Sequence, residues 1–452
     1  MSETPVTSPD STEFFRTVDL RGRHLSRAAL KAAVPRVHEE SNREAEDAVR
    51  GIIAAVRDGG HAALRDFAQR FDGVSLEQVR VPRAALRDAL AGLDAAVRAA
   101  LEESIHRARL FAEAQRPGDV ETVLAEGAVV RQRWIPVSRV GLYVPGGLAP
   151  LASSVVMNVV PALAAGVTSV ALASPPQKDH GGLPHPTILA AAELLGIEEV
   201  YAMGGAQAIA AFAYGVAEAE GSAEIEAVDL ITGPGNVYVA TAKRLVRGVV
   251  GIDSEAGPTE IAVLADHTAR ASLVAADLIS QAEHDPRASS VLITPSTELA
   301  DAVREELLRQ IVTARHGERI TTALSGPQSG VVLVDDVSQG VAVADAYAAE
   351  HLEIMTEDSP AVAARIRNAG AIFVGDYSPV SLGDYCAGSN HVLPTSGTAL
   401  FSSGLNVTTF LRAVQEIEYS RDALKGVRTH IEQLASAENL PSHGEAVSIR
   451  FR

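Results

Sequence analysis

The chain has 452 residues, a length that predicts two or three compact units rather than one. Its 57 acidic residues outnumber the 39 basic ones and give a formal net charge of −18, which repels phosphate backbones and argues against nucleic acid as a partner. A single cysteine, Cys386, excludes an intrachain disulfide framework and a cysteine-rich zinc site, so any metal must be held by nitrogen and oxygen ligands.

The N-terminal stretch "MSETPVTSPDSTEFFR" has neither the basic region nor the apolar region of a secretory signal. We therefore predict a polar extension over residues 1–30 and a cytoplasmic protein. Residues 43–115 follow a helical period, with Ala and Leu on one face and charges on the other, which predicts helices that flank a sheet.

A charge-free stretch between Arg139 and Lys178 is long enough to resemble a membrane span, but its prolines and glycines divide it into short pieces. "VGLYV" predicts a buried strand, "SSVVMNVVPALAAG" a helix opened by Ser153 or Ser154, and "VTSVALAS" a second strand. This βαβ unit is followed by "EEVYAMGG", "AQAIAAFAYG", "AVDLITGPGN" and "VYVATAKRLV", so residues 141–258 are predicted to form an inserted nucleotide-binding α/β domain. No G-x-G-x-x-G fingerprint occurs there, and from the pattern alone a dinucleotide site and a plain α/β core remain equally open.

The alternation of strands and helices returns in "EIAVLAD", "SSVLITPS", "SGVVLVDD" and "AGAIFVGDY". We predict that residues 31–140 and 259–405 form one discontinuous α/β domain. The fold class is then two Rossmann-like α/β/α domains, one inserted in the other. Residues 406–452 are predicted as an appendage with a helix, a proline-containing loop and a short strand-like tail.

Three polar clusters each allow two interpretations. In "SQAEHDP", Gln281 and His284 could face one ion from a helix end, or the histidine could simply lie near the helix dipole before a proline. In "GDYCAGSNHVLPT", Asp384 and His391 lie on an irregular loop, where binding groups concentrate, but an Asx-turn with a surface histidine fits equally. His443 in "NLPSHGE" is by itself an ordinary loop histidine.

Nine segments in order resemble the histidinol dehydrogenase family: "VGLYVPGG", "SSVVMNVVPALAAGV", "MGGAQAIAA", "TGPGNVYVATAKR", "IDSEAGPTE", "SQAEHDP", "EHLEI", "GDYCAGSNHVLPT" and "GLNVTTFLR". The resemblance covers nearly the whole chain after the first thirty residues. It implies an NAD-dependent, zinc-containing enzyme that completes histidine biosynthesis by oxidising L-histidinol twice, through L-histidinal, to L-histidine. The implied zinc has one site per subunit, where it positions the substrate.

The resemblance also implies roles for individual residues. The catalytic residues are Glu350, which activates water for hydration of the aldehyde, and His351, which accepts the alcohol proton; we expect the pair to share one helical turn. The zinc ligands are Gln281, His284, Asp384 and His443. The implied substrate-binding residues are Thr259, Gln281, His284, His351, Asp384, His391, Glu438 and His443, and the implied NAD contacts are Tyr143, Gln207 and Asn236. Two departures, Ala349 and the pair Leu151-Ala152, remove no reactive group.

The resemblance implies a homodimer in which the C-terminal appendage carries Glu438 and His443 into the other subunit's active site. Two alternatives remain. A related dehydrogenase could act on another small alcohol such as a sulfopropanediol, although His391 and Glu438 favour histidinol. From another class, the metal site could belong to a hydrolase with zinc-bound hydroxide, which would leave the glycine-rich strand ends unexplained.

Overall fold

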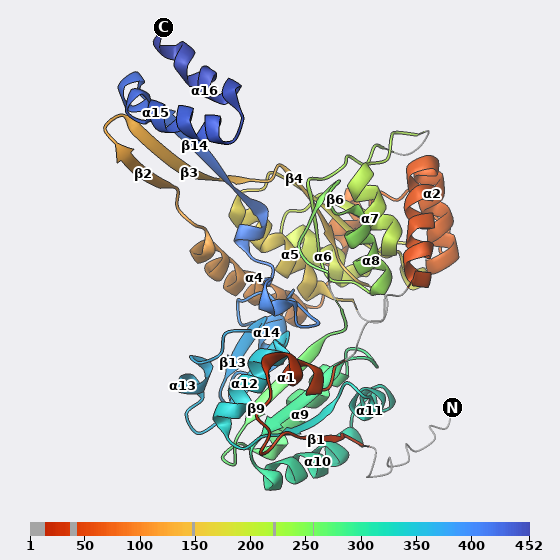
Figure 1. Cartoon of the computed structure of the whole chain (residues 1–452). Coiled ribbons are helices and arrows are strands. Elements are labelled where there is room, and N and C mark those ends of the chain that lie inside the picture. Colours follow the sequence, from red (N-terminus) through yellow and green to blue (C-terminus); the bar gives the residue numbers. More distant parts are fainter. Residues whose placement is uncertain (1–13, 37–42, 147–149, 220–222, 256) are drawn as a thin grey trace.

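The computed structural model describes residues 14–36, 43–146, 150–219, 223–255 and 257–452. These form two α/β domains and a projecting appendage (Figure 1). The two Rossmann-like sheets are parallel, as expected for the predicted fold class. Within the described ranges, no helix has the length and apolar character needed to cross a membrane.

The first sheet, sheet B, has five parallel strands in the order β6-β5-β4-β7-β8. Its strands are almost continuously buried, as in parallel sheets covered on both faces. The predicted alternation over residues 141–258 is confirmed in β4 (Arg139–Tyr143), α5 (Ala152–Ala165), β5 (Ser169–Ser174), α6 (Pro186–Leu194), β6 (Glu199–Ala202), α7 (Gly205–Tyr214), β7 (Leu230–Thr232) and α8 (Val237–Val246). The short strand β8 (Gly251–Ile252) was not predicted.

The helices of residues 43–115 pack on the helices that flank sheet B, whereas we predicted that they join residues 259–405. They are α2 (Arg43–Phe67), continued by a π-helical turn η1 (Ala68–Asp72), α3 (Arg83–Ala91) and α4 (Ala95–Gln115). Helix α2 packs on α7 and α8, α3 on α6, and α4 on α5. Their apolar residues, such as Val49 and Ile105, complete the two hydrophobic cores on either side of sheet B. The helical period alone could not assign these helices to one domain or the other.

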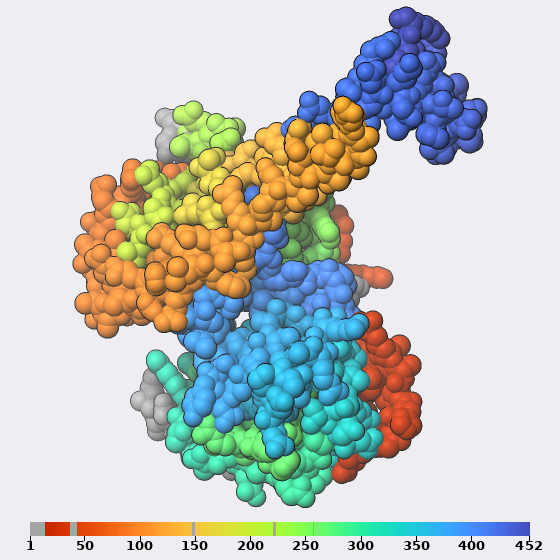
Figure 2. Space-filling view, turned by 90° about the vertical axis from the view of Figure 1, so that its left-hand side faces the viewer, coloured from red at the N-terminus to blue at the C-terminus, as the bar shows by residue number. Residues whose placement is uncertain are grey.

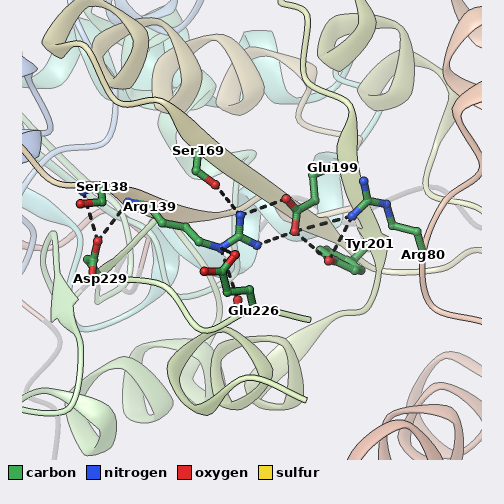
Figure 3. A network of polar contacts seen from close by, with 8 residues as sticks. All are labelled: Arg80, Ser138, Arg139, Ser169, Glu199, Tyr201, Glu226 and Asp229. Atoms are coloured by element: carbon green, nitrogen blue, oxygen red, sulfur yellow. Dashed lines mark hydrogen bonds and ion pairs between the residues drawn. The ribbon is translucent and has the colours of Figure 1, made fainter. Parts of the chain in front are cut away.

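A polar network ties the strands of sheet B together near their amino ends (Figure 3). The Arg139 guanidinium donates hydrogen bonds to Glu199, at 3.0 Å, and to Ser169. The Tyr201 hydroxyl also donates to Glu199, at 2.7 Å, and accepts one from Arg80. Buried charges of this kind need such partners, so the network fixes β4, β5 and β6 at the edge opposite their carboxyl ends.

The second sheet, sheet A, has six parallel strands in the order β1-β11-β10-β9-β12-β13. Strands β9, β10, β11 and β13 were predicted, and β1 and β12 were not. The elements are β1 (Thr17–Asp19), α1 (Arg27–Ala33), β9 (Glu260–Ala265), α9 (Ala271–Ala282), β10 (Ser289–Thr294), α10 (Thr297–Ile311), α11 (Gly317–Ser325), β11 (Gly330–Leu333), α12 (Val337–Tyr347), β12 (His351–Met355), α13 (Ser359–Ala363), β13 (Ala371–Val374) and α14 (Val380–Tyr385).

The predicted polar extension over residues 1–30 is wrong for its described part. Strand β1 pairs in parallel with β11, and Phe14, Phe15 and Leu20 are buried. These apolar residues anchor the chain to the edge of sheet A, because they complete its core beside β11. Residues 1–13 lie outside the described residues.

The appendage is a three-stranded antiparallel sheet, β14-β3-β2, capped by two helices. It projects away from both α/β domains (Figures 1 and 2). It contains β2 (Val120–Ala125), β3 (Ala128–Pro136), β14 (Leu411–Tyr419), α15 (Arg421–Ala437), α16 (Pro441–Ser448) and η5 (Ile449–Phe451); short 3-10 turns elsewhere are η2 (Lys178–His180), η3 (Thr398–Leu400) and η4 (Val407–Phe410).

Two expectations about the appendage need correction. The expected strand-like tail is helical, and the β2–β3 hairpin comes from residues assigned to the discontinuous domain. Strand β3 of the hairpin pairs with β14 along its whole length, from Leu411 opposite Pro136 to Tyr419 opposite Ala128. This long ladder makes the hairpin and the C-terminal residues one structural unit.

Candidate active site

The predicted catalytic residues lie at the amino edge of sheet A. Thr259 directly precedes β9 and Glu350 directly precedes β12, and these two strands are neighbours in the sheet. Gln281 lies in the last turn of α9, which returns from the carboxyl end of β9 to the same edge. Asp384 was expected on an irregular loop but lies in the short helix α14, which packs against α9.

Glu350 is held by a small hydrogen-bond network. Its Oε2 accepts hydrogen bonds from the Thr259 hydroxyl at 2.6 Å and from the Glu260 backbone N–H at 2.9 Å. Gln281 Nε2 in turn donates to the Thr259 hydroxyl at 2.5 Å. Burial raises the pKa of Glu350 to about 7, although the Thr259 hydrogen bond opposes this shift. A carboxyl group with a pKa near neutrality suits general-base chemistry at physiological pH.

His351 is the first residue of β12 and is buried. Its Nδ1 lies 3.2 Å from the Glu260 backbone oxygen, and a carbonyl oxygen can only accept a hydrogen bond. Nδ1 therefore carries the hydrogen, and Nε2 is left to accept a proton. Burial lowers the pKa of His351, which keeps the imidazole neutral.

The expected shared helical turn of Glu350 and His351 is wrong. Helix α12 ends at Tyr347, because Ala348 adopts the left-handed conformation with φ 50°. The chain then bends through Glu350 into β12. The pair still meets at one place, with His351 Nδ1 3.7 Å from Glu350 Oε2.

Three of the four expected zinc ligands lie on the adjoining ends of α9 and α14. His284 follows the end of α9, and its Nε2 is 3.9 Å from Asp384 Oδ2. The side-chain oxygen Oε1 of Gln281 is buried without a hydrogen-bond partner among the described residues. A buried acceptor in this state is costly unless a donor or cation satisfies it. One imidazole, one carboxylate and one amide oxygen would supply three of the four ligands of a zinc ion and leave the fourth position open.

The fourth expected ligand is not brought to this place. His443 lies on α16, and Glu438 at the end of α15, in the projecting appendage (Figure 1). Accordingly, no group of three His, Cys, Asp or Glu side chains that could hold a metal occurs within the described part of a single chain.

His391 connects the site with the domain of sheet B. Its Nδ1 lies 3.1 Å from the Asp384 backbone oxygen, and its Nε2 lies 3.3 Å from the Ser154 hydroxyl in the first turn of α5. We expected Ser153 or Ser154 to cap α5, but the N-cap is Leu151. Ser154 is therefore free to contact His391, and this contact brings the N-terminus of α5 next to the loop and helix that carry His391 and Asp384.

The expected NAD contacts all lie at the carboxyl edge of sheet B. Tyr143 ends β4 and its hydroxyl accepts a hydrogen bond from Gly205 N–H at 3.1 Å. Gln207 lies in the first turn of α7, and the Asn236 side chain caps the N-terminus of α8. Helix N-termini at a parallel sheet edge favour bound phosphate.

The loop after β7 is built for close approach to β4. Gly233 has φ 118°, and a Cβ there would collide with the Tyr143 backbone oxygen, so only glycine fits. Lys243 donates to the Gly233 carbonyl at 3.0 Å and forms a buried ion pair with Asp253. Asp253 also accepts a hydrogen bond from Gly233 N–H at 2.8 Å. The strand order of sheet B reverses between β4 and β7, which is where ligands bind in such folds.

A pair of buried carboxyl groups lies behind the site and was not predicted. Asp277 is one turn before Gln281 on α9, and Glu353 is two residues after His351 on β12. Burial raises the pKa of both groups, and the nearby Asp277 charge raises that of Glu353 further. Glu353 is completely buried beside Asp277, and its raised pKa means that it holds its proton at neutral pH.

Together, a sheet edge with helix N-termini that suit phosphate and a cluster of Glu, His and amide groups in the second domain are the features of a two-domain NAD-dependent dehydrogenase. The chain belongs to the histidinol dehydrogenase family, whose model matches residues 35–451. It is 61% identical to histidinol dehydrogenase of Nocardia farcinica over 96% of this chain and 97% of that one. It is 60% identical to the enzyme of Mycobacterium tuberculosis, with the same coverage. The crystal structure of histidinol dehydrogenase from Elizabethkingia anophelis superposes with a TM-score of 0.89 at 30% identity, covering 97% of this chain and 98% of that one.

Proposed function

We propose that the chain converts L-histidinol to L-histidine in two successive NAD-dependent oxidations at the amino edge of sheet A. The observation that carries this proposal is the convergence of the Glu350 network, a neutral His351 and the unpartnered Gln281 oxygen, with His391 joining Asp384 to Ser154 in the first turn of α5. An alcohol dehydrogenase needs a proton acceptor beside a hydride acceptor, and these two domain edges supply the two positions.

His351 accepts the proton from the substrate hydroxyl at Nε2, because its Nδ1 hydrogen is directed to the Glu260 carbonyl. Glu350 accepts a proton from the water that hydrates the aldehyde, and Thr259 and the Glu260 N–H hold its carboxylate in place for this step. As the water adds, protonated His351 returns its proton to the aldehyde oxygen and becomes neutral again. His351 then accepts a hydroxyl proton of the hydrated aldehyde, and the second oxidation yields the carboxylate. NAD bound along Tyr143, Gln207 and Asn236 would take up the hydride in each oxidation.

Gln281, His284 and Asp384 would hold zinc together with His443 of the partner subunit. The bound ion would fix the amino and imidazole nitrogens of histidinol. The appendage supports a homodimer, since it exposes Val123, Leu124 and Ile417 to solvent on a projecting sheet. Glu438 of the partner subunit and His391 would then contact the substrate. A cytoplasmic location fits the dependence on NAD and the single cysteine.

The product stoichiometry tests the proposal. The purified protein should form two NADH for each histidinol consumed, and zinc should copurify near one ion per chain. Formation of a single NADH, or faster steady-state turnover of a sulfopropanediol than of histidinol, would contradict the substrate assignment.

A further inference from the structure

Arg36 lies just after α1 and reaches the back of the catalytic residues from the N-terminal part of the chain. Its guanidinium donates to both carboxylate oxygens of Glu260, at 3.2 and 3.0 Å, and both side chains are almost fully buried. The same guanidinium donates to the Tyr347 backbone oxygen at 2.5 Å and stacks 4.1 Å from the centre of the Tyr347 ring. Arg36 therefore joins the start of β9 to the end of α12.

Both of these anchoring points adjoin the proposed catalytic pair. The Glu260 backbone N–H binds the Glu350 carboxylate, and the Glu260 backbone oxygen contacts His351 Nδ1. One residue thus touches both members of the pair through its peptide groups, while its side chain is held by Arg36. Arg36 also holds Tyr347, three residues before Glu350 in the chain.

The turn between Tyr347 and Glu350 must be fixed by contacts from other segments, such as those of Arg36. Ala348 has a positive φ, which is unfavourable for a non-glycine residue and persists only where surrounding contacts fix it. Burial raises the pKa of Glu260 to about 7, and the Arg36 charge opposes that shift. Without the guanidinium, Glu260 would lose the partner that stabilises its buried charge.

We infer that Arg36 and Glu260 form a positioning clamp that sets the orientation of Glu350 and the tautomer of His351. The inference rests on the catalytic roles proposed above. Neither clamp side chain contacts an expected zinc ligand or NAD residue in the described structure. Loss of the clamp should therefore lower kcat for both oxidations and leave the KM for NAD and the zinc content unchanged.

The test compares Arg36→Met and Arg36→Lys with Arg21→Met, in which an exposed arginine of the same N-terminal segment loses its surface ion pair with Asp19. We expect Arg36→Met to lower kcat about 10- to 100-fold with histidinol and with histidinal, as a small misplacement of reacting groups can do. Arg36→Lys keeps the charge but cannot donate hydrogen bonds to Glu260 and to the Tyr347 carbonyl in the same geometry, so it should recover part of that loss. Arg21→Met should match the wild type.

Glu260→Gln keeps an acceptor for Arg36 and provides a second test if Arg36→Met does not fold; it should lower kcat for both steps by a smaller factor. Wild-type kcat in Arg36→Met and Glu260→Gln, or a loss that follows zinc content or the KM for NAD, would overturn the clamp. Glu350→Gln and His351→Asn are made alongside. If these two keep full activity, the proposed catalytic roles fail and the clamp has no pair to position; if they are impaired while the clamp variants are not, only the clamp fails.

Discussion

Replacing Glu350 by Gln should separate the two halves of the reaction. The amide oxygen of the new side chain would still accept the hydrogen bonds that Thr259 and the Glu260 N–H make to Glu350 Oε2. The side chain should therefore keep its place, and the change removes only the ability to accept a proton from water. We expect the oxidation of histidinol to histidinal to stay within about fivefold of the wild-type rate, since His351 carries that proton.

The expected loss in the second half follows from general-base catalysis, which contributes typically about 10²- to 10⁴-fold, or about 3–5 kcal/mol in the barrier. Oxidation of supplied histidinal by NAD should slow by that factor, because the aldehyde must first be hydrated. Reduction of histidinal by NADH reverses the first oxidation and needs no water, so it reports the hydride step alone. Both reactions can be followed by NADH absorbance.

Glu357→Gln is a matched control, because Glu357 lies exposed just beyond β12 and the substitution makes the same chemical change in the same segment. It should leave both reactions unchanged. If Glu350→Gln impairs reduction of histidinal as severely as oxidation of histidinal, Glu350 serves the hydride step or the structure of the site, and the separate role for hydration is wrong.

Three further results are expected. In the wild type, the raised pKa of Glu353 lowers the free energy of unfolding by about 1.4 kcal/mol for each pH unit above the pKa that this group has in the unfolded chain. Glu353→Gln removes this loss, so it should stabilise the protein increasingly as the pH rises from about 5 to about 8. Equal differences in melting temperature at both pH values would contradict the protonated pair with Asp277. Lys243→Met leaves a buried carboxylate unpaired, so it should cost about 3–5 kcal/mol of stability and raise the KM for NAD; an unchanged KM in the folded variant would separate the pair from the nucleotide loop. Inactive His443→Ala and His351→Ala proteins, refolded together, should recover about a quarter of wild-type activity, since about half of the dimers are mixed and each has one intact site; no recovery at any ratio would exclude a site shared between subunits.

The sequence predicted four of the five strands of sheet B because β4, β5, β6 and β7 are short apolar runs that end at glycine or proline, with a helix after each. It did not predict β12, because "HLEIM" follows an alanine-rich helix without a turn signal, and only the left-handed conformation of Ala348 ends that helix. The prediction that α2, α3 and α4 belong to the domain of residues 259–405 was wrong for a related reason. An amphipathic period shows that a helix has a buried face but not which domain that face packs against.

The site residues were named from the family resemblance, while the contacts around them are visible only in the folded structure. Glu260 is a charged residue at the start of an apolar strand, and that contrast was the one sequence signal for a buried polar role. Arg36 carried no signal, because its partners are more than 200 positions away in the chain. Contacts made by backbone groups, such as those of Glu260, leave no trace in a residue pattern.

The two domains present opposite edges of their sheets to the reaction, and the helix dipoles account for this choice. Tyr143, Gln207 and Asn236 lie at the carboxyl edge of sheet B, where helices α7 and α8 begin and their N-termini favour the negative phosphates of NAD. Gln281 and His284 lie at the amino edge of sheet A, where α9 ends and its carbonyl groups favour a cation. Parallel sheets place all helix starts at one edge and all helix ends at the other. Two such sheets that face each other with opposite edges would bring the proposed nucleotide and metal sites to one substrate, and Ser154 and His391 touch where those edges meet.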